Sequence, residues 1–116
     1  MASGRLLIVA PDADLRLSLQ FALEAEGYAV TARANIGETT ARERFDCTIL
    51  DHRAAIGPTA DIAAFCRRAH PVVLLASEPS HGIGPVFRLI QKPLLGEPLS
   101  AAVRDALMVR RSPRPK

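Results

Sequence analysis

Lys92 and Asp51 are the two residues of this chain whose types and positions point most directly to chemistry. Every other cation inside the chain is Arg, and the only other Lys is the last residue, Lys116. Arg and Lys are not interchangeable where a compact ammonium must reach a single oxygen atom. Lys92 follows an apolar stretch and precedes Pro93, and Asp51 ends the apolar run at residues 47–50. The sequence therefore predicts a site in which an ammonium faces a carboxylate.

The elements that must position this pair alternate along the chain between strands and helices. Apolar runs predict strands at residues 6–9, 28–32, 47–50, 72–75 and 86–91. Helical periodicity predicts helices at residues 12–27, 36–44 and 59–69 and a last one that begins near Pro98. The helix at 36–44 should be short and weak, because Gly37 and two Thr residues lower its propensity. Residues 77–85 contain two Gly and two Pro, so we expect a loop or one turn there in place of a full fourth helix.

This alternation predicts an α/β fold of the doubly wound type, with an open parallel sheet and helices on both of its faces. In such sheets the functional crevice lies outside the carboxyl ends of the strands, where the strand order reverses. If the first, third and fifth strands end there together, residues 10–11, Asp51 and Lys92 lie close to one another.

Length and composition indicate one cytoplasmic domain. The chain has 116 residues, of which 48% are hydrophobic and 23% charged, as in ordinary globular domains. The N-terminal apolar run is too short for a signal peptide or a membrane span. Cys47 and Cys66 lack metal-ligand spacing and are expected to be buried thiols in a reducing compartment. We expect residues 1–109 to form the domain and residues 110–116 to form a basic, proline-containing tail or linker.

The charge pattern argues against nucleic acid as the partner. Much of the net charge of +3 lies in residues 110–116, and the five aromatic residues are scattered singly. DNA binding through the tail alone is a remaining alternative, and a salt-sensitive interaction would then depend on those residues. A nucleotide or small-molecule binder is a further alternative, but the turn at residues 10–13 has no glycine that would let the backbone approach a phosphate. The three histidines, His52, His70 and His81, are expected at the surface and not as metal ligands.

Taken in order, these features resemble a bacterial response-regulator receiver domain over residues 5–109. The resemblance rests on Leu-Leu-Ile-Val at 6–9 with Asp-Ala-Asp-Leu-Arg at 12–16, Glu-Ala-Glu-Gly-Tyr-Ala-Val at 24–30, Phe-Asp-Cys-Thr-Ile-Leu-Asp at 45–51 and Gln-Lys-Pro-Leu at 91–94. It implies a five-stranded, flavodoxin-like sheet with strand order 2-1-3-4-5, and a role in a two-component or phosphorelay system.

The resemblance also implies roles for single residues. Asp51 stands at the position that accepts a phosphoryl group from a histidine kinase, and Lys92 stands at the position of the cation that pairs with it. A Mg²⁺ ion would be held by Asp51, by two acidic residues after the first strand and by a backbone carbonyl, here that of Arg53. A hydroxyl after the fourth strand would bind the phosphoryl group, and two registers remain open, one placing Ala76 there and the other Ser77.

The sequence departs from this pattern at the metal site. The acidic pair is replaced by Ala10 and Pro11, while Asp12 lies one step further on and is expected to cap the first helix. Because Mg²⁺ needs several charged oxygens in near-octahedral positions, any Mg²⁺ site should be weak. Arg53 or Arg16 could take part of the charge role of the metal. Leu89 stands where receivers often carry a switching Tyr or Phe.

We therefore expect a receiver-like signalling module with an eroded Mg²⁺ site. It would not be an enzyme, and it would act mainly through contacts with a histidine kinase or another signalling protein. The alternative is a receiver that still accepts a phosphoryl group at Asp51, inefficiently.

Overall fold

A single parallel sheet organises the chain, whose computed structural model describes residues 4–39, 44–55, 59–76, 86, 88–92 and 97–111. The strand order is β2-β1-β3-β4-β5. The strands are β1 (Arg5–Val9), β2 (Ala29–Arg33), β3 (Cys47–Asp51), β4 (Val72–Ala76) and β5 (Arg88–Gln91). The helices are α1 (Ala13–Ala25), α2 (Thr59–Arg68) and α3 (Glu97–Arg111), with 3-10 turns η1 (Ile36–Glu38) and η2 (His52–Ala54). The predicted fold class and strand order are confirmed.

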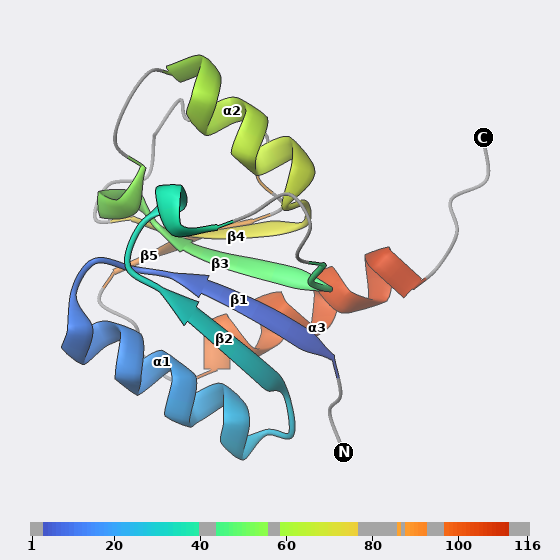
Figure 1. Ribbon diagram of the computed structural model, residues 1–116. Helices are drawn as coiled ribbons and strands as arrows, with labels where there is room; N and C mark the ends of the chain where they lie inside the picture. Colours follow the sequence, from blue (N-terminus) through green and yellow to red (C-terminus); the bar gives the residue numbers. More distant parts are fainter. Residues whose placement is uncertain are drawn as a thin grey trace.

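The helices cover both faces of the sheet (Figure 1). Helices α1 and α3 pack on one face in a cluster that includes Leu23, Ile49 and Val103, and α2 packs on the other face in a cluster that includes Leu50 and Phe65. Strands β3 and β4 are buried along their whole length. Burial on both faces explains why these strands are continuous apolar runs in the sequence.

Helix α1 has clear start and stop signals. The Asp12 carboxylate accepts a hydrogen bond from the backbone N–H of Asp14 at 3.0 Å, which makes Asp12 the N-cap. At the other end the N–H of Gly27 donates to the carbonyl of Glu24, and that of Tyr28 to the carbonyl of Leu23. This is a Schellman motif, and Gly27 adopts the left-handed φ of 104° that the motif requires.

The expected helix over residues 36–44 was wrong in extent. The helical conformation is one 3-10 turn, η1, and Arg44 lies outside any helix, while residues 40–43 are outside the described part of the chain. The Thr39 hydroxyl donates to the Ile36 carbonyl at 2.6 Å and the Thr39 N–H donates to the same carbonyl at 3.0 Å. A side chain that binds the backbone locally competes with helix propagation, and Gly37 adds an entropic cost.

Three further expectations can be set beside the structure. The loop expected at residues 77–85 falls outside the described residues. Helix α3 continues to Arg111, two residues past the predicted domain boundary, so the division at residue 109 stays a prediction. Cys47 and Cys66 are buried free thiols as predicted, and burial together with nearby Asp46 raises the pKa of Cys47 to about 12. Within the described ranges, no helix is long and apolar enough to cross a membrane.

Candidate functional site

The structure brings Asp51 and Lys92 together at the carboxyl edge of the sheet. Asp51 is the last residue of β3, which is hydrogen-bonded to β4, and Lys92 directly follows β5 on the far side of β4. The Lys92 backbone N–H donates to the Ala76 carbonyl at 2.8 Å and so fixes the end of β5 against β4. From this position the Lys92 Nζ reaches across β4 and donates to Asp51 Oδ1 at 2.8 Å.

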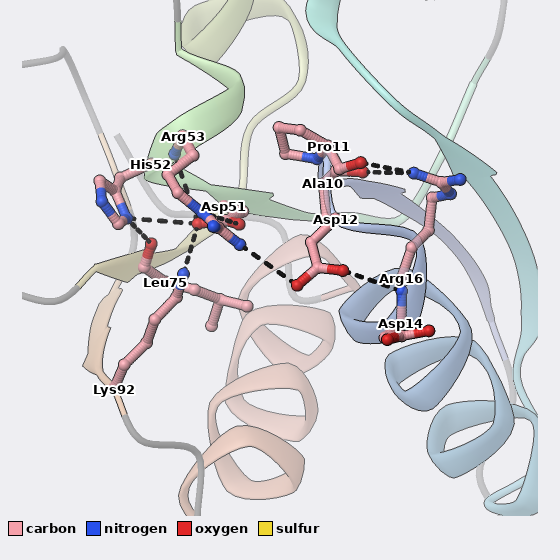
Figure 2. A network of polar contacts seen from close by, with 10 residues as sticks. All are labelled: Ala10, Pro11, Asp12, Asp14, Arg16, Asp51, His52, Arg53, Leu75 and Lys92. Atoms are coloured by element: carbon pink, nitrogen blue, oxygen red, sulfur yellow. Dashed lines mark hydrogen bonds and ion pairs between the residues drawn. The ribbon is translucent and has the colours of Figure 1, made fainter.

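The Asp51 carboxylate has further donors around it, as Figure 2 shows. The backbone N–H of Arg53 donates to Asp51 Oδ1 at 3.3 Å, and the Arg53 Nε donates to Asp51 Oδ2 at 3.4 Å. Asp51 thereby also caps the η2 turn that follows it. Both carboxylate oxygens of this fully buried side chain are engaged by groups from the chain itself.

Opposing effects determine the charge of Asp51. Burial by itself raises the pKa of the Asp51 carboxyl, because desolvation disfavours the anion. The hydrogen bond from Lys92, the N–H of Arg53 and the two cationic charges act in the other direction and outweigh burial, so the pKa is lowered overall. Asp51 is therefore a carboxylate at neutral pH.

His52 lies against the site, contrary to the expectation of a surface histidine. Its Nδ1 is 3.2 Å from Asp51 Oδ1 and 3.1 Å from the Leu75 carbonyl, and its side chain is only 20% exposed. Both neighbours are acceptors, so Nδ1 must carry the proton that it shares with them. The η2 turn folds the ring back over the end of β4, and adjacency to Asp51 was the sole sequence signal for this contact. His70 is exposed as expected, and His81 is outside the described residues.

Arg53 connects Asp51 to the start of α1. One nitrogen of its guanidinium, Nη2, lies 3.6 Å from Asp12 Oδ2, while its Nε contacts Asp51. The Arg53 and Asp12 side chains are about half exposed, at 51% and 46%. Contacts thus run from Lys92 through Asp51 and Arg53 to Asp12, which caps α1 (Figure 2).

Arg16 has a different role from the one considered for it. Its Nη1 donates to the backbone carbonyls of Ala10 at 2.8 Å and Pro11 at 3.2 Å. Ala10 and Pro11 are the residues that replace the acidic pair. The guanidinium of Arg16 therefore engages the oxygen atoms of this turn, and Arg53 is the arginine that reaches Asp51.

Two of the remaining expected site residues, Ala76 and Leu89, lie at the end of β4 and in β5. Ala76 is the last residue of β4, fully buried and paired with Gln91, whereas Ser77 lies outside the described residues, so the two hydroxyl registers stay open. Leu89 is half-buried and packs against the cluster on the α2 face. Among the described residues, no group of three or more His, Cys, Asp or Glu side chains could hold a metal ion.

Comparisons with known proteins identify the fold. No family model matches the sequence, and no curated protein sequence matches it significantly. Among solved structures, a CheY-like receiver domain from Methanospirillum hungatei has a TM-score of 0.80 and 21% identity, over 94% of this chain and 97% of that one. The HemR receiver domain of Leptospira biflexa has a TM-score of 0.73 and 23% identity, over 97% and 98%. CheY4, a chemotaxis protein of Vibrio cholerae, has a TM-score of 0.73 and 22% identity, over 91% and 100%.

The chain therefore has the fold of CheY-like response-regulator receiver domains. At these identities the likeness concerns the fold, and function has to be argued from the site.

Proposed function

We propose that this chain is a receiver-like signalling module of a two-component or phosphorelay system that acts mainly through protein–protein contacts. The observation that carries this proposal is the state of Asp51. Its buried, ionised carboxylate forms ion pairs with Lys92 at 2.8 Å and with Arg53 at 3.4 Å, in the part of the fold where a receiver would hold a metal ion.

The residues of the site do not fit Mg²⁺. This ion needs near-octahedral coordination by oxygens and gives up water reluctantly. Residues 10 and 11 offer no carboxylate, and their carbonyls already accept from Arg16. The carboxylate of Asp12 serves the α1 N-cap and the contact with Arg53. Mg²⁺ binding is therefore proposed to be weak or absent, and the backbone carbonyl of Arg53 would have little support as a ligand.

Surface composition supports a role in protein contacts. Leu17 and Phe21 lie one turn apart on α1 and are 53% and 74% exposed, and Met108 on α3 is 67% exposed. Covering apolar side chains of this size with a partner protein removes their surface from water, which is favourable, and Phe and Met are enriched in protein interfaces. The proposed partner is a histidine kinase or another cytoplasmic signalling protein, and we propose no catalytic turnover for the domain itself.

A second candidate function is phosphoryl acceptance at Asp51. The observation in its favour is that Asp51 is anionic and that the Lys92 ammonium is within hydrogen-bond distance of it. In this reaction an Asp51 oxygen would form a bond to phosphorus while the bond from phosphorus to the leaving group of the donor breaks. Arg53 would have to give up its contact with Asp51 Oδ2 to admit the new group.

One experiment separates the two functions. The protein and its Asp51→Asn variant are incubated with phosphoramidate and MgCl₂, and their intact masses are measured, with a receiver domain that has a complete acidic pair as the positive control. We expect no added phosphoryl group on either protein. If the wild type gains one and Asp51→Asn does not, the chain is a phosphoryl acceptor and the proposed metal-poor, contact-only function is wrong.

A further inference from the structure

We infer that Arg53 excludes divalent cations from the Asp51 site by holding its guanidinium between the carboxylates of Asp51 and Asp12. This inference rests on the proposed absence of a Mg²⁺ site and assigns the exclusion to one residue. The loss of the acidic pair would then be only part of the cause, because a built-in cation also contacts the carboxylates that remain.

The geometry places three groups of Arg53 on these carboxylates. Its backbone N–H lies 3.3 Å from Asp51 Oδ1, its Nε lies 3.4 Å from Asp51 Oδ2, and its Nη2 lies 3.6 Å from Asp12 Oδ2. The guanidinium is planar, always charged and able to contact two acceptors at once. Figure 2 shows it lying between Asp51 and the start of α1.

Charge makes this position unfavourable for a metal ion. The carboxylates of Asp51 and Asp12 are balanced by the ammonium of Lys92 and the guanidinium of Arg53. A divalent cation would enter a cluster without net charge and would face both cations at short range. Like charges repel strongly where one side of the site is buried, and Asp51 is fully buried.

Position 11 allows this effect to be separated from the missing carboxylates. Pro11 is exposed and directly precedes Asp12, so an Asp at position 11 adds a carboxylate near the site without burying it. If Arg53 is the excluding group, the added carboxylate should be insufficient as long as the guanidinium is present. Removing the guanidinium as well would leave three carboxylates against one ammonium, a net charge that suits a divalent cation.

The test compares the affinity of Mn²⁺ alone for the wild type, Arg53→Gln, Pro11→Asp and the double variant, measured from the electron paramagnetic resonance signal of free Mn²⁺. We expect weak binding by the first three proteins and an affinity about tenfold higher or more for the double variant, a difference of about 1.4 kcal/mol. Adding Asp51→Asn to the double variant should abolish the gain, which locates the ion at this site. Equal affinities of Pro11→Asp and the double variant would overturn the inference, as would a gain that survives Asp51→Asn.

A matched control removes a different arginine. Arg88 forms an exposed ion pair with Asp105 at 2.8 Å, away from Asp51. In the Pro11→Asp background, Arg88→Gln changes the net charge by the same amount as Arg53→Gln and should leave the Mn²⁺ affinity unchanged. A gain in affinity equal to that of the double variant would show a general charge effect and overturn the inference. Thermal unfolding of each variant checks that it is folded before titration. Phosphoryl gain by the wild type would refute the proposed function, whereas the comparison between Pro11→Asp and the double variant tests Arg53 whichever way that experiment turns out.

Discussion

Asp51 is a fully buried charge, and a buried charge is tolerated only where other groups compensate for its lost hydration. Lys92 provides the shortest contact, at 2.8 Å, and Arg53 provides a longer one from a side chain that is half exposed. The Lys92 side chain is only 20% exposed, so water screens its contact with Asp51 less. Among the cations at this edge, Lys92 therefore has the larger influence on whether Asp51 can remain buried and ionised.

Replacement of Lys92 by Ala should lower the free energy of unfolding by about 3 kcal/mol, since it leaves a buried carboxylate without its main partner. Arg88→Ala is the control, because it also removes one cation from an ion pair, but that pair is 42% and 50% exposed. Exposed pairs contribute about 1 kcal/mol or less. Urea unfolding monitored by circular dichroism measures both. Similar losses for the two variants would mean that Asp51 does not depend on Lys92.

The meeting of Asp51 and Lys92 could be predicted because it depends on chain direction and strand order. Parallel strands end at the same edge, and in the order implied by the resemblance only the fourth strand separates the third from the fifth, so residues that end those two strands lie within reach of each other. The contacts of His52 and Arg16 could not be predicted in this way. They depend on how the η2 turn and the turn at residues 10–11 orient side chains, and apolar periodicity carries no information about either.

At the level of secondary structure, Asp12 has two functions at the start of α1. Its carboxylate caps the helix by accepting from Asp14, and the same group contacts the Arg53 guanidinium. The cap is a local interaction, whereas the ion pair joins α1 to the turn after β3. The two functions differ in chemistry, because a cap requires an acceptor oxygen and an ion pair requires a charge.

Asp12→Ala should therefore cost about 1 kcal/mol of stability or somewhat more, since both the cap and the ion pair are lost. Asp12→Asn keeps an acceptor at the N-cap and should cost only a few tenths of a kcal/mol, the usual contribution of an exposed pair. Thermal or urea unfolding of the two variants under the same conditions gives the comparison. An Asn variant as unstable as the Ala variant would show that the contact with Arg53, and not the cap, is the main contribution of Asp12.

Elements were predictable where pattern and termination signals agree. Helix α1 has a capping Asp12, an apolar stripe that buries Leu19 and Leu23, and Gly27 at its end, so its extent differs from expectation by only one or two residues. The segment after β2 has no such agreement. Apolar spacing suggested a helix there, but Gly37 and the hydroxyl of Thr39 favour the single turn that the structure contains.

For the whole molecule, the fold predicted from the sequence is confirmed, whereas the predicted function stays a proposal. Uninterrupted apolar strands alternating with helices restrict the chain to a parallel sheet covered on both faces, and the solved structures confirm this fold at about 20% identity. The same fold accommodates different chemistry at its carboxyl edge, so function has to be argued from the residues of the site, among which we propose roles for Arg53 and Pro11. Their effect depends on distances between side chains, which become available only with the structure.

The hydrophobic clusters on the two faces of the sheet both contain residues of β1, β3 and β4, so the molecule should unfold as one unit. Leu50 is fully buried on the α2 face of β3, whereas Tyr28, the only tyrosine in a chain without tryptophan, lies in the core on the opposite face. Leu50→Ala should cost about 2–5 kcal/mol through the cavity it leaves. It should shift the urea midpoint of Tyr28 fluorescence and that of far-ultraviolet circular dichroism equally.

Leu17→Ala, at a position that is 53% exposed, is the control and should change stability by only about 0.5 kcal/mol. If Leu50→Ala moved the circular dichroism transition and left the Tyr28 transition in place, the two faces of the sheet would be independent units.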